Sequence, residues 1–107
     1  MPHYLLQVAY TPDAWATQLK NPQNRIEAIR PAVQGLGGRI ECAYISFGEY
    51  DVIAVLDMPD NVSAAAFSIV ASAGGALKAA KTTPLMTMEE GIEAMRKAGG
   101  AGYRPPT

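Results

Sequence analysis

The sequence predicts an α+β domain whose strands and helices alternate in the order βαββαβ, followed by one more helix near the C-terminus. Short runs of alternating apolar residues indicate the strands, and apolar residues spaced three and four apart indicate the helices. Glycine and proline clusters separate these segments. The chain has 107 residues, of which 49% are apolar and 18% charged, so we expect a single folded domain.

Residues 3–10 form the first predicted strand, because large apolar side chains alternate along it. One face carries Tyr4, Leu6, Val8 and Tyr10, and the other carries Leu5 and Ala9. Thr11-Pro12-Asp13 then has the chemistry of a helix start, with a capping hydroxyl, a proline in the first turn and an acidic residue at the positive end. A short helix carrying Trp15 and Leu19 on one face is expected to follow.

A second helical segment is expected to start at Asn21-Pro22. Its apolar stripe consists of Ile26, Ile29, Val33 and Leu36. Pro31 lies inside this segment, and it predicts a kink because it lacks an N–H and crowds the carbonyl of Glu27. The glycines at 35, 37 and 38 end the helix.

The next two strands are predicted over residues 39–47 and 50–58, with Gly48-Glu49 as the hairpin turn between them. In the first of them we expect Ile40, Cys42 and Tyr44 on one side and Ala43, Ile45 and Phe47 on the other. The strand over 50–58 is the most apolar run of the chain, with Val52, Ala54 and Leu56 facing one way and Ile53 and Val55 the other.

The remaining elements are a helix, a strand and a final helix. Pro59-Asp60-Asn61 is expected to cap a helix over 61–73. Its inward residues are predicted to be Val62, Ala66, Ile69 and Ala73. Residues 76–85 form the fourth predicted strand, in which Lys78, Lys81 and Pro84 are typical of a sheet edge.

Thr87 and Glu90 form a capping box for a last helix ending near Lys97. The glycines and prolines after it predict a flexible tail over 99–107, which leaves residues 1–98 as the domain.

Right-handed crossovers between these elements favour a ferredoxin-like antiparallel sheet with strand order 4-1-3-2. Helices would cover one face of this sheet, yet the two central strands carry apolar residues on both faces. A second copy of the chain is the simplest cover, so we expect a homo-oligomer of the dimeric α/β-barrel type, either a dimer or a multiple of dimers. The alternative is that the C-terminal helix folds over the second face.

Composition and charge disfavour several other classes. The net charge is −1 with no cluster of basic residues, so nucleic-acid binding is not expected. One cysteine, Cys42, excludes an intrachain disulfide, and no apolar run suggests a signal peptide or a membrane helix, so we expect a cytoplasmic protein without membrane contact. No phosphate-binding glycine loop and no zinc-ligand spacing occur, so no cofactor and no metal are expected.

The candidate catalytic residues are Asp51, Tyr50 and His3. Asp51 would serve as a general base if it were buried, and Tyr50 would orient a substrate oxygen. His3 is the only histidine, and an imidazole can move protons near neutral pH. The structural alternative is that Asp51 binds backbone donors at the turn, which polar residues in turns often do.

Four further residues are candidates for ligand binding, either as aromatic contacts or as charged anchors: Tyr4, Tyr44, Glu49 and Lys81. For Lys81 the alternative is protection of a sheet edge. A small apolar ligand would suit the apolar faces of the central strands.

Several segments of the chain resemble the GYD domain family over about residues 3–97. The resemblance rests on the Tyr-containing first strand, Gly37-Gly38, the Gly48-Glu49-Tyr50-Asp51 turn and the Thr82-Thr83 region. It implies a ferredoxin-like domain of the dimeric α/β-barrel type, and it brings no catalytic residue.

Three functions are compatible with these observations. The first is a homo-oligomeric small-ligand-binding or regulatory protein. The second is a cofactor-independent enzyme, an isomerase or oxygenase, that works in a cavity between two sheets. The third is a purely structural oligomerisation module.

Overall fold

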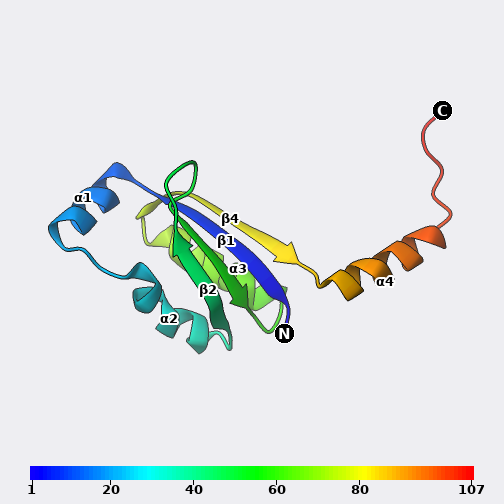
Figure 1. The fold of residues 1–107 in the computed structure, drawn as a ribbon, viewed down its shortest axis with the longest axis horizontal. Helices are drawn as coiled ribbons and strands as arrows, with labels where there is room; N and C mark the ends of the chain where they lie inside the picture. The colour runs from blue at the N-terminus through cyan, green and yellow to red at the C-terminus, as the bar shows by residue number, and fades with distance from the viewer.

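The fold is one four-stranded antiparallel sheet with helices on one of its faces, as a computed structural model of residues 1–107 shows (Figure 1). The strand order β2-β3-β1-β4 is the predicted order, with β1 and β3 in the centre. The elements are β1 (His3–Tyr10), α1 (Pro12–Lys20), α2 (Arg25–Gly35), β2 (Arg39–Ile45), β3 (Val52–Asp57), α3 (Asn61–Ala73), β4 (Leu77–Leu85) and α4 (Met88–Gly99). The predicted α+β, ferredoxin-like fold class is therefore confirmed.

The core lies between the sheet and the helices α2 and α3. The alternate residues of β1 and β3 that face the helices are all buried: Tyr4, Leu6, Val8, Tyr10, Val52, Ala54 and Leu56. Val33 of α2 and Phe67 of α3 pack against them. The predicted alternation of both central strands is thus confirmed.

Two helix predictions were wrong in detail. Helix α2 begins at Arg25 and not at Asn21-Pro22, because the side chain of Asn24 accepts hydrogen bonds from the amides of Ile26 and Glu27 and so caps it. In α3 the buried residues are Ala64 and Phe67, whereas Val62 and Ile69 are exposed. The many alanines make α3 apolar on every side, and its one large aromatic ring sets the buried face.

The connection between β2 and β3 also differs from the prediction. Strand β2 ends at Ile45 and β3 begins only at Val52. Neither Gly48 nor Glu49 has the positive φ that a two-residue hairpin turn requires. The connection over 46–51 is held instead by hydrogen bonds from the amide of Ser46 to the carbonyl of Asp51 and from the hydroxyl of Ser46 to the carbonyl of Tyr50.

Strand β2 contains a β-bulge that changes which residues share a face. The pairing shifts between Ile40 and Cys42, so Ile40 lies opposite Leu56 and Cys42 lies opposite Val55. Ile40 therefore faces the helices together with Ala43, whereas the simple alternation had placed it beside Cys42.

We call the sheet surface opposite α2 and α3 the open face. The register places on it Arg39, Glu41, Cys42 and Tyr44 of β2, Ile53, Val55 and Asp57 of β3, His3, Leu5 and Gln7 of β1, and Lys81, Thr83 and Leu85 of β4. Leu5, Ile53 and Val55 make its centre apolar. Its polar residues form two groups: His3, Arg39, Glu41 and Asp57 at the end where β1 begins, and Gln7 and Lys81 in a row further along the sheet.

Helix α4 does not cover the open face, because it projects from the end of β4 into solvent (Figure 1). The molecule measures 57 × 34 × 22 Å with a radius of gyration of 17.1 Å, whereas a compact chain of this length has about 13 Å. The predicted capping box of Thr87 and Glu90 is present at the start of α4. The alternative in which the C-terminal helix shields the sheet is therefore not observed in this structure.

Candidate functional site

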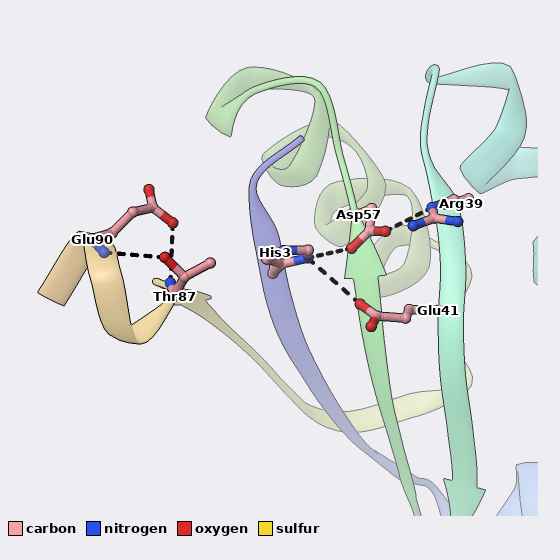
Figure 2. A network of polar contacts seen from close by, with 6 residues as sticks. All are labelled: His3, Arg39, Glu41, Asp57, Thr87 and Glu90. Atoms are coloured by element: carbon pink, nitrogen blue, oxygen red, sulfur yellow. Dashed lines mark hydrogen bonds and ion pairs between the residues drawn. The ribbon is translucent and has the colours of Figure 1, made fainter.

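Three ionisable residues lie in one row across three neighbouring strands. His3 at the start of β1 is paired with Asp57 at the end of β3, and Asp57 is paired with Arg39 at the start of β2. Residues paired in this way point to the same side of a sheet, so all three side chains lie on the open face. We call these residues, with Glu41, the polar cluster (Figure 2).

Asp57 is the centre of the polar cluster. Its Oδ1 lies 2.5 Å from Nδ1 of His3, and its Oδ2 accepts a hydrogen bond of 2.7 Å from Nε of Arg39. The side chain of Asp57 is only 2% exposed, so both carboxylate oxygens have protein partners in place of water. Such pairing is what a buried carboxylate requires.

Two opposing effects set the ionisation of Asp57. Burial raises the pKa of its carboxyl group. The hydrogen bonds from His3 and Arg39, together with the charges of these two residues, lower the pKa by a larger amount, so the pKa lies below its ordinary value of 3.8. Asp57 is therefore ionised at neutral pH and can only accept hydrogen bonds. It follows that Nδ1 of His3 carries the hydrogen in their bond, which leaves Nε2 free to accept a proton.

Glu41 joins the polar cluster from the β-bulge of β2. Its Oε2 lies 3.5 Å from Nδ1 of His3, and its side chain is half exposed. Glu41 is the extra residue between the pairs Ile40–Leu56 and Cys42–Val55, so the bulge gives the open face one side chain more than regular pairing would.

The start of α4 lies close to the same end of the sheet. Figure 2 shows Thr87 and Glu90 at this end of the sheet, as a bonded pair that is separate from the polar cluster. The pKa of Glu90 is lowered, first by the hydrogen bonds from Thr87 and more weakly by the charge of His3. The first turn of α4 is thus near enough to His3 to feel its charge, but no hydrogen bond or ion pair joins it to the polar cluster.

Asp51 and Tyr50 lie at the opposite end of the sheet from His3. Asp51 accepts hydrogen bonds from the backbone amide of Tyr10 at 2.9 Å and from the indole of Trp15 at 3.3 Å. Along β3, the steps from Asp57 back to Asp51 correspond to roughly 20 Å. The structure therefore does not bring His3 together with Asp51 and Tyr50, and the carboxylate of Asp51 is engaged by donors from β1 and α1.

The four candidate ligand-binding residues lie in three different regions of the structure. Tyr44 and Lys81 are exposed on the open face, at the two edges of one row, with Ile53 and Gln7 between them. Tyr4 is buried on the helix side, where its hydroxyl donates to Oδ1 of Asn61. Glu49 is exposed in the β2–β3 connection.

Sequence reasoning missed Arg39, Glu41 and Asp57 as site residues. These residues are far from His3 in the sequence; Asp57, for example, is 54 residues away. Only the strand register brings them close to His3. One signal was available: Asp57 is the only charged residue in β3, the most apolar strand, and a buried charge needs partners.

Several clefts lie on the helix side of the sheet, and two of them border α2. One of about 420 Å³ is bounded by α2 and the edge strand β2, and its lining includes Tyr10, Arg25, Ile40 and Tyr44. The second, of about 260 Å³, lies between α2 and α3 and is lined almost entirely by apolar residues such as Ile29, Phe67 and Ala71. Neither of these two clefts is lined by His3 or Asp57, but Glu41 of the polar cluster lines the first.

Comparison with known proteins gives one match. The family model of the GYD domain matches residues 4–95, which is most of the chain. No curated protein and no solved structure matches. None of the helices combines the length and the apolar character that a membrane-spanning segment needs.

Proposed function

This chain belongs to the GYD domain family, and we propose that it works as a homo-oligomer that binds a small ligand between the open faces of two sheets. The observation that supports this proposal most is the apolar centre of the open face. Leu5, Ile53 and Val55 form it on the two central strands, and no helix of the same chain lies over them. An apolar surface of this kind on a soluble domain is usually covered by a partner.

The area available suits a second copy as the cover. Four strands of six to nine residues span about 19 Å by 25 Å, or roughly 500 Å², from the usual strand spacing and rise. A stable interface needs about 800 Å² per partner. The sheet alone falls short of this value, so a further surface must contribute.

Helix α4 offers that further surface. Its apolar residues Met88, Ile92 and Met95 lie on one side and are exposed by 80%, 47% and 71%. A helix of this length is only marginally stable without tertiary contacts, so it needs a surface on which to pack. About 18 Å of helix adds roughly 180 Å², which brings the total close to the usual size.

The ligand that fits the space between two such sheets is a small apolar molecule with a polar end. Leu5, Ile53 and Val55 would contact its apolar body. Lys81 and the polar cluster, at the borders of the open face, would contact its polar group.

The oligomer is tested by light scattering on the wild type and on two matched variants. Val55→Glu places a charge in the centre of the open face, whereas Val62→Glu places it on α3, where Val62 is 79% exposed. We expect the wild type and Val62→Glu to be dimers or larger and Val55→Glu to have the mass of one 11.4 kDa chain. A wild type of that mass at micromolar concentration would refute the proposal.

Ligand binding is tested with the dye 1-anilinonaphthalene-8-sulfonate, which has an apolar body and one charged group. We expect saturable binding to the wild type and to Val62→Glu and its loss in Val55→Glu. Ala71→Trp fills the apolar cleft between α2 and α3 and should not affect binding. Loss of binding in Ala71→Trp alone would place the ligand in that cleft and overturn the inter-sheet site. An oligomer that binds no small molecule would favour the purely structural module.

A second candidate function, a cofactor-independent enzyme, is supported by the bond between His3 and Asp57. A buried carboxylate that holds Nδ1 of an imidazole orients Nε2 as a general base. The probe 5-nitrobenzisoxazole tests this, because its ring opens when a base removes one proton. We expect saturable acceleration that His3→Gln abolishes and Glu49→Gln leaves intact; equal rates for wild type and His3→Gln would exclude base catalysis by His3.

A further inference from the structure

The geometry points to a divalent-cation site formed by His3, Glu41 and Asp57 within a single chain. One nitrogen and two carboxylate oxygens, one from each residue, all lie within 4.8 Å of one another. They come from three different strands, and two of the three side chains are partly exposed, so an ion can reach them from the open face.

The spacing of the three atoms is close to that of ligands on one metal ion. Bonds from Zn²⁺ to imidazole nitrogen and carboxylate oxygen are about 2.0–2.2 Å, so two ligands of a tetrahedral ion lie about 3–3.5 Å apart. Nδ1 of His3 already lies 3.5 Å from Oε2 of Glu41 and 2.5 Å from Oδ1 of Asp57. An ion would replace the His3–Asp57 hydrogen bond, with the ring proton moved from Nδ1 to Nε2, and would need only small side-chain movements.

The charge of the polar cluster favours a cation. With a neutral imidazole, the carboxylates of Glu41 and Asp57 outweigh the single positive charge of Arg39. The guanidinium of Arg39 is 69% exposed, so water screens part of its repulsion. The carboxylate of Asp57, in contrast, is only 2% exposed, so water screens its negative charge much less.

Arg39 then has a positioning role. It donates to Oδ2 of Asp57 and leaves Oδ1 directed at His3. Metal-binding carboxylates are commonly held by a second hydrogen bond of this kind, which fixes the oxygen that faces the ion. The bulge at Glu41 supplies the third ligand, and bulges often re-aim a side chain beside a functional site.

The donor set selects a class of metal. One imidazole and two carboxylates suit Zn²⁺, Mn²⁺ or Fe²⁺ and do not suit ions that require thiolates. Three protein ligands leave at least one position for water or another small molecule, as in sites that perform chemistry. This site lies in one chain and does not depend on the proposed oligomer.

The test is a titration of the untagged, chelator-treated protein with Mn²⁺ and with Zn²⁺. Because His3 is the only histidine, its ring resonances report on the site without ambiguity. We expect Mn²⁺ to broaden these resonances selectively and calorimetry to give one Zn²⁺ per chain. His3→Gln and Glu41→Gln should each weaken Zn²⁺ binding by roughly tenfold or more.

Matched controls separate the site from adventitious binding. Glu49→Gln removes an exposed carboxylate in the β2–β3 connection, and Cys42→Ser removes the only thiol; both should bind Zn²⁺ as the wild type does. Glu41 is half exposed, so Glu41→Gln should fold normally, which circular dichroism verifies. Unchanged affinity in Glu41→Gln, or no saturable binding to the wild type, would show that the polar cluster is only an ion-pair network.

Discussion

The indole nitrogen of Trp15 donates a hydrogen bond to the carboxylate of Asp51, 3.3 Å away, and this bond ties α1 to the connection between β2 and β3. The same carboxylate accepts the amide of Tyr10, whose ring meets that of Trp15 edge to face at 5.3 Å. One acidic residue therefore joins the end of β1, the first helix and the start of β3.

Replacing Asp51 should mainly reduce stability. Asp51→Ala leaves the amide of Tyr10 and the indole of Trp15 without their acceptor, which should lower the free energy of unfolding by about 1–3 kcal/mol. Asp51→Asn keeps one acceptor oxygen and should lower the free energy of unfolding by a smaller amount. Urea unfolding followed by circular dichroism measures both values. If both variants were as stable as the wild type, the structural role of Asp51 would be disproved and its catalytic candidacy strengthened.

Stability should fall in acid partly because of Asp57. Its pKa in the folded protein is lower than its ordinary value of 3.8, because the hydrogen bonds from His3 and Arg39 outweigh the effect of burial. The unfolded chain therefore takes up the proton first as pH falls. The stabilisation by ionised Asp57 is present above pH 3.8 and is lost as pH falls through the lowered pKa.

Unfolding free energies measured between about pH 5 and pH 2 should therefore decline less steeply in Asp57→Asn than in the wild type. At neutral pH this variant should be the less stable of the two, since Arg39 and His3 lose an ionised partner. Glu49→Gln, which changes an exposed carboxylate, serves as the control and should follow the wild-type curve. Parallel curves for Asp57→Asn and wild type would contradict the assigned shift.

The same substitution should have opposite effects at two glycines. A Cβ at Gly38 would lie 2.3 Å from the sulfur of Met58 and 2.7 Å from the carbonyl oxygen of Asp57, so Gly38→Ala should cost about 1–3 kcal/mol of stability. A Cβ at Gly91 meets nothing within 4 Å, and Gly91→Ala should favour α4 by up to about 1 kcal/mol. Urea unfolding measures the first effect, and an increase in helical circular dichroism measures the second.

The sequence was sufficient for the sheet topology because each central strand has a clear alternating pattern. Tyr4, Leu6 and Val8 face the helices as predicted, and their neighbour Leu5 lies on the open face. The capping box at Thr87 was equally local, since its two hydrogen bonds join residues three apart. Features that depend on neighbouring residues were thus accessible without the structure.

The polar cluster was not accessible in this way. His3 and Asp57 meet only because β1 and β3 pair in one particular register, and a shift of one residue would have sent Asp57 to the opposite face. The bulge that brings Glu41 to the open face leaves no pattern in the sequence of β2. The candidates chosen from the sequence were instead those beside a recognisable turn, Tyr50 and Asp51.

The buried face of α3 provides the last prediction, because apolar spacing alone pointed to the wrong side. Phe67 is 3% exposed and packs in the core, whereas Ile69 is 67% exposed. Phe67→Ala should therefore lower the free energy of unfolding by about 3–5 kcal/mol, since it removes a large ring and leaves a cavity. Ile69→Ala should change it by no more than about 0.5 kcal/mol.

Urea unfolding of both variants at low and high protein concentration measures these effects and separates two explanations of an unexpected result. If Ile69→Ala were as destabilising as Phe67→Ala at every concentration, α3 would present the other face to the sheet and the described core would be wrong. A loss in Ile69→Ala that grew with protein concentration would instead show that a second copy buries Ile69, because only an intermolecular contact depends on mass action.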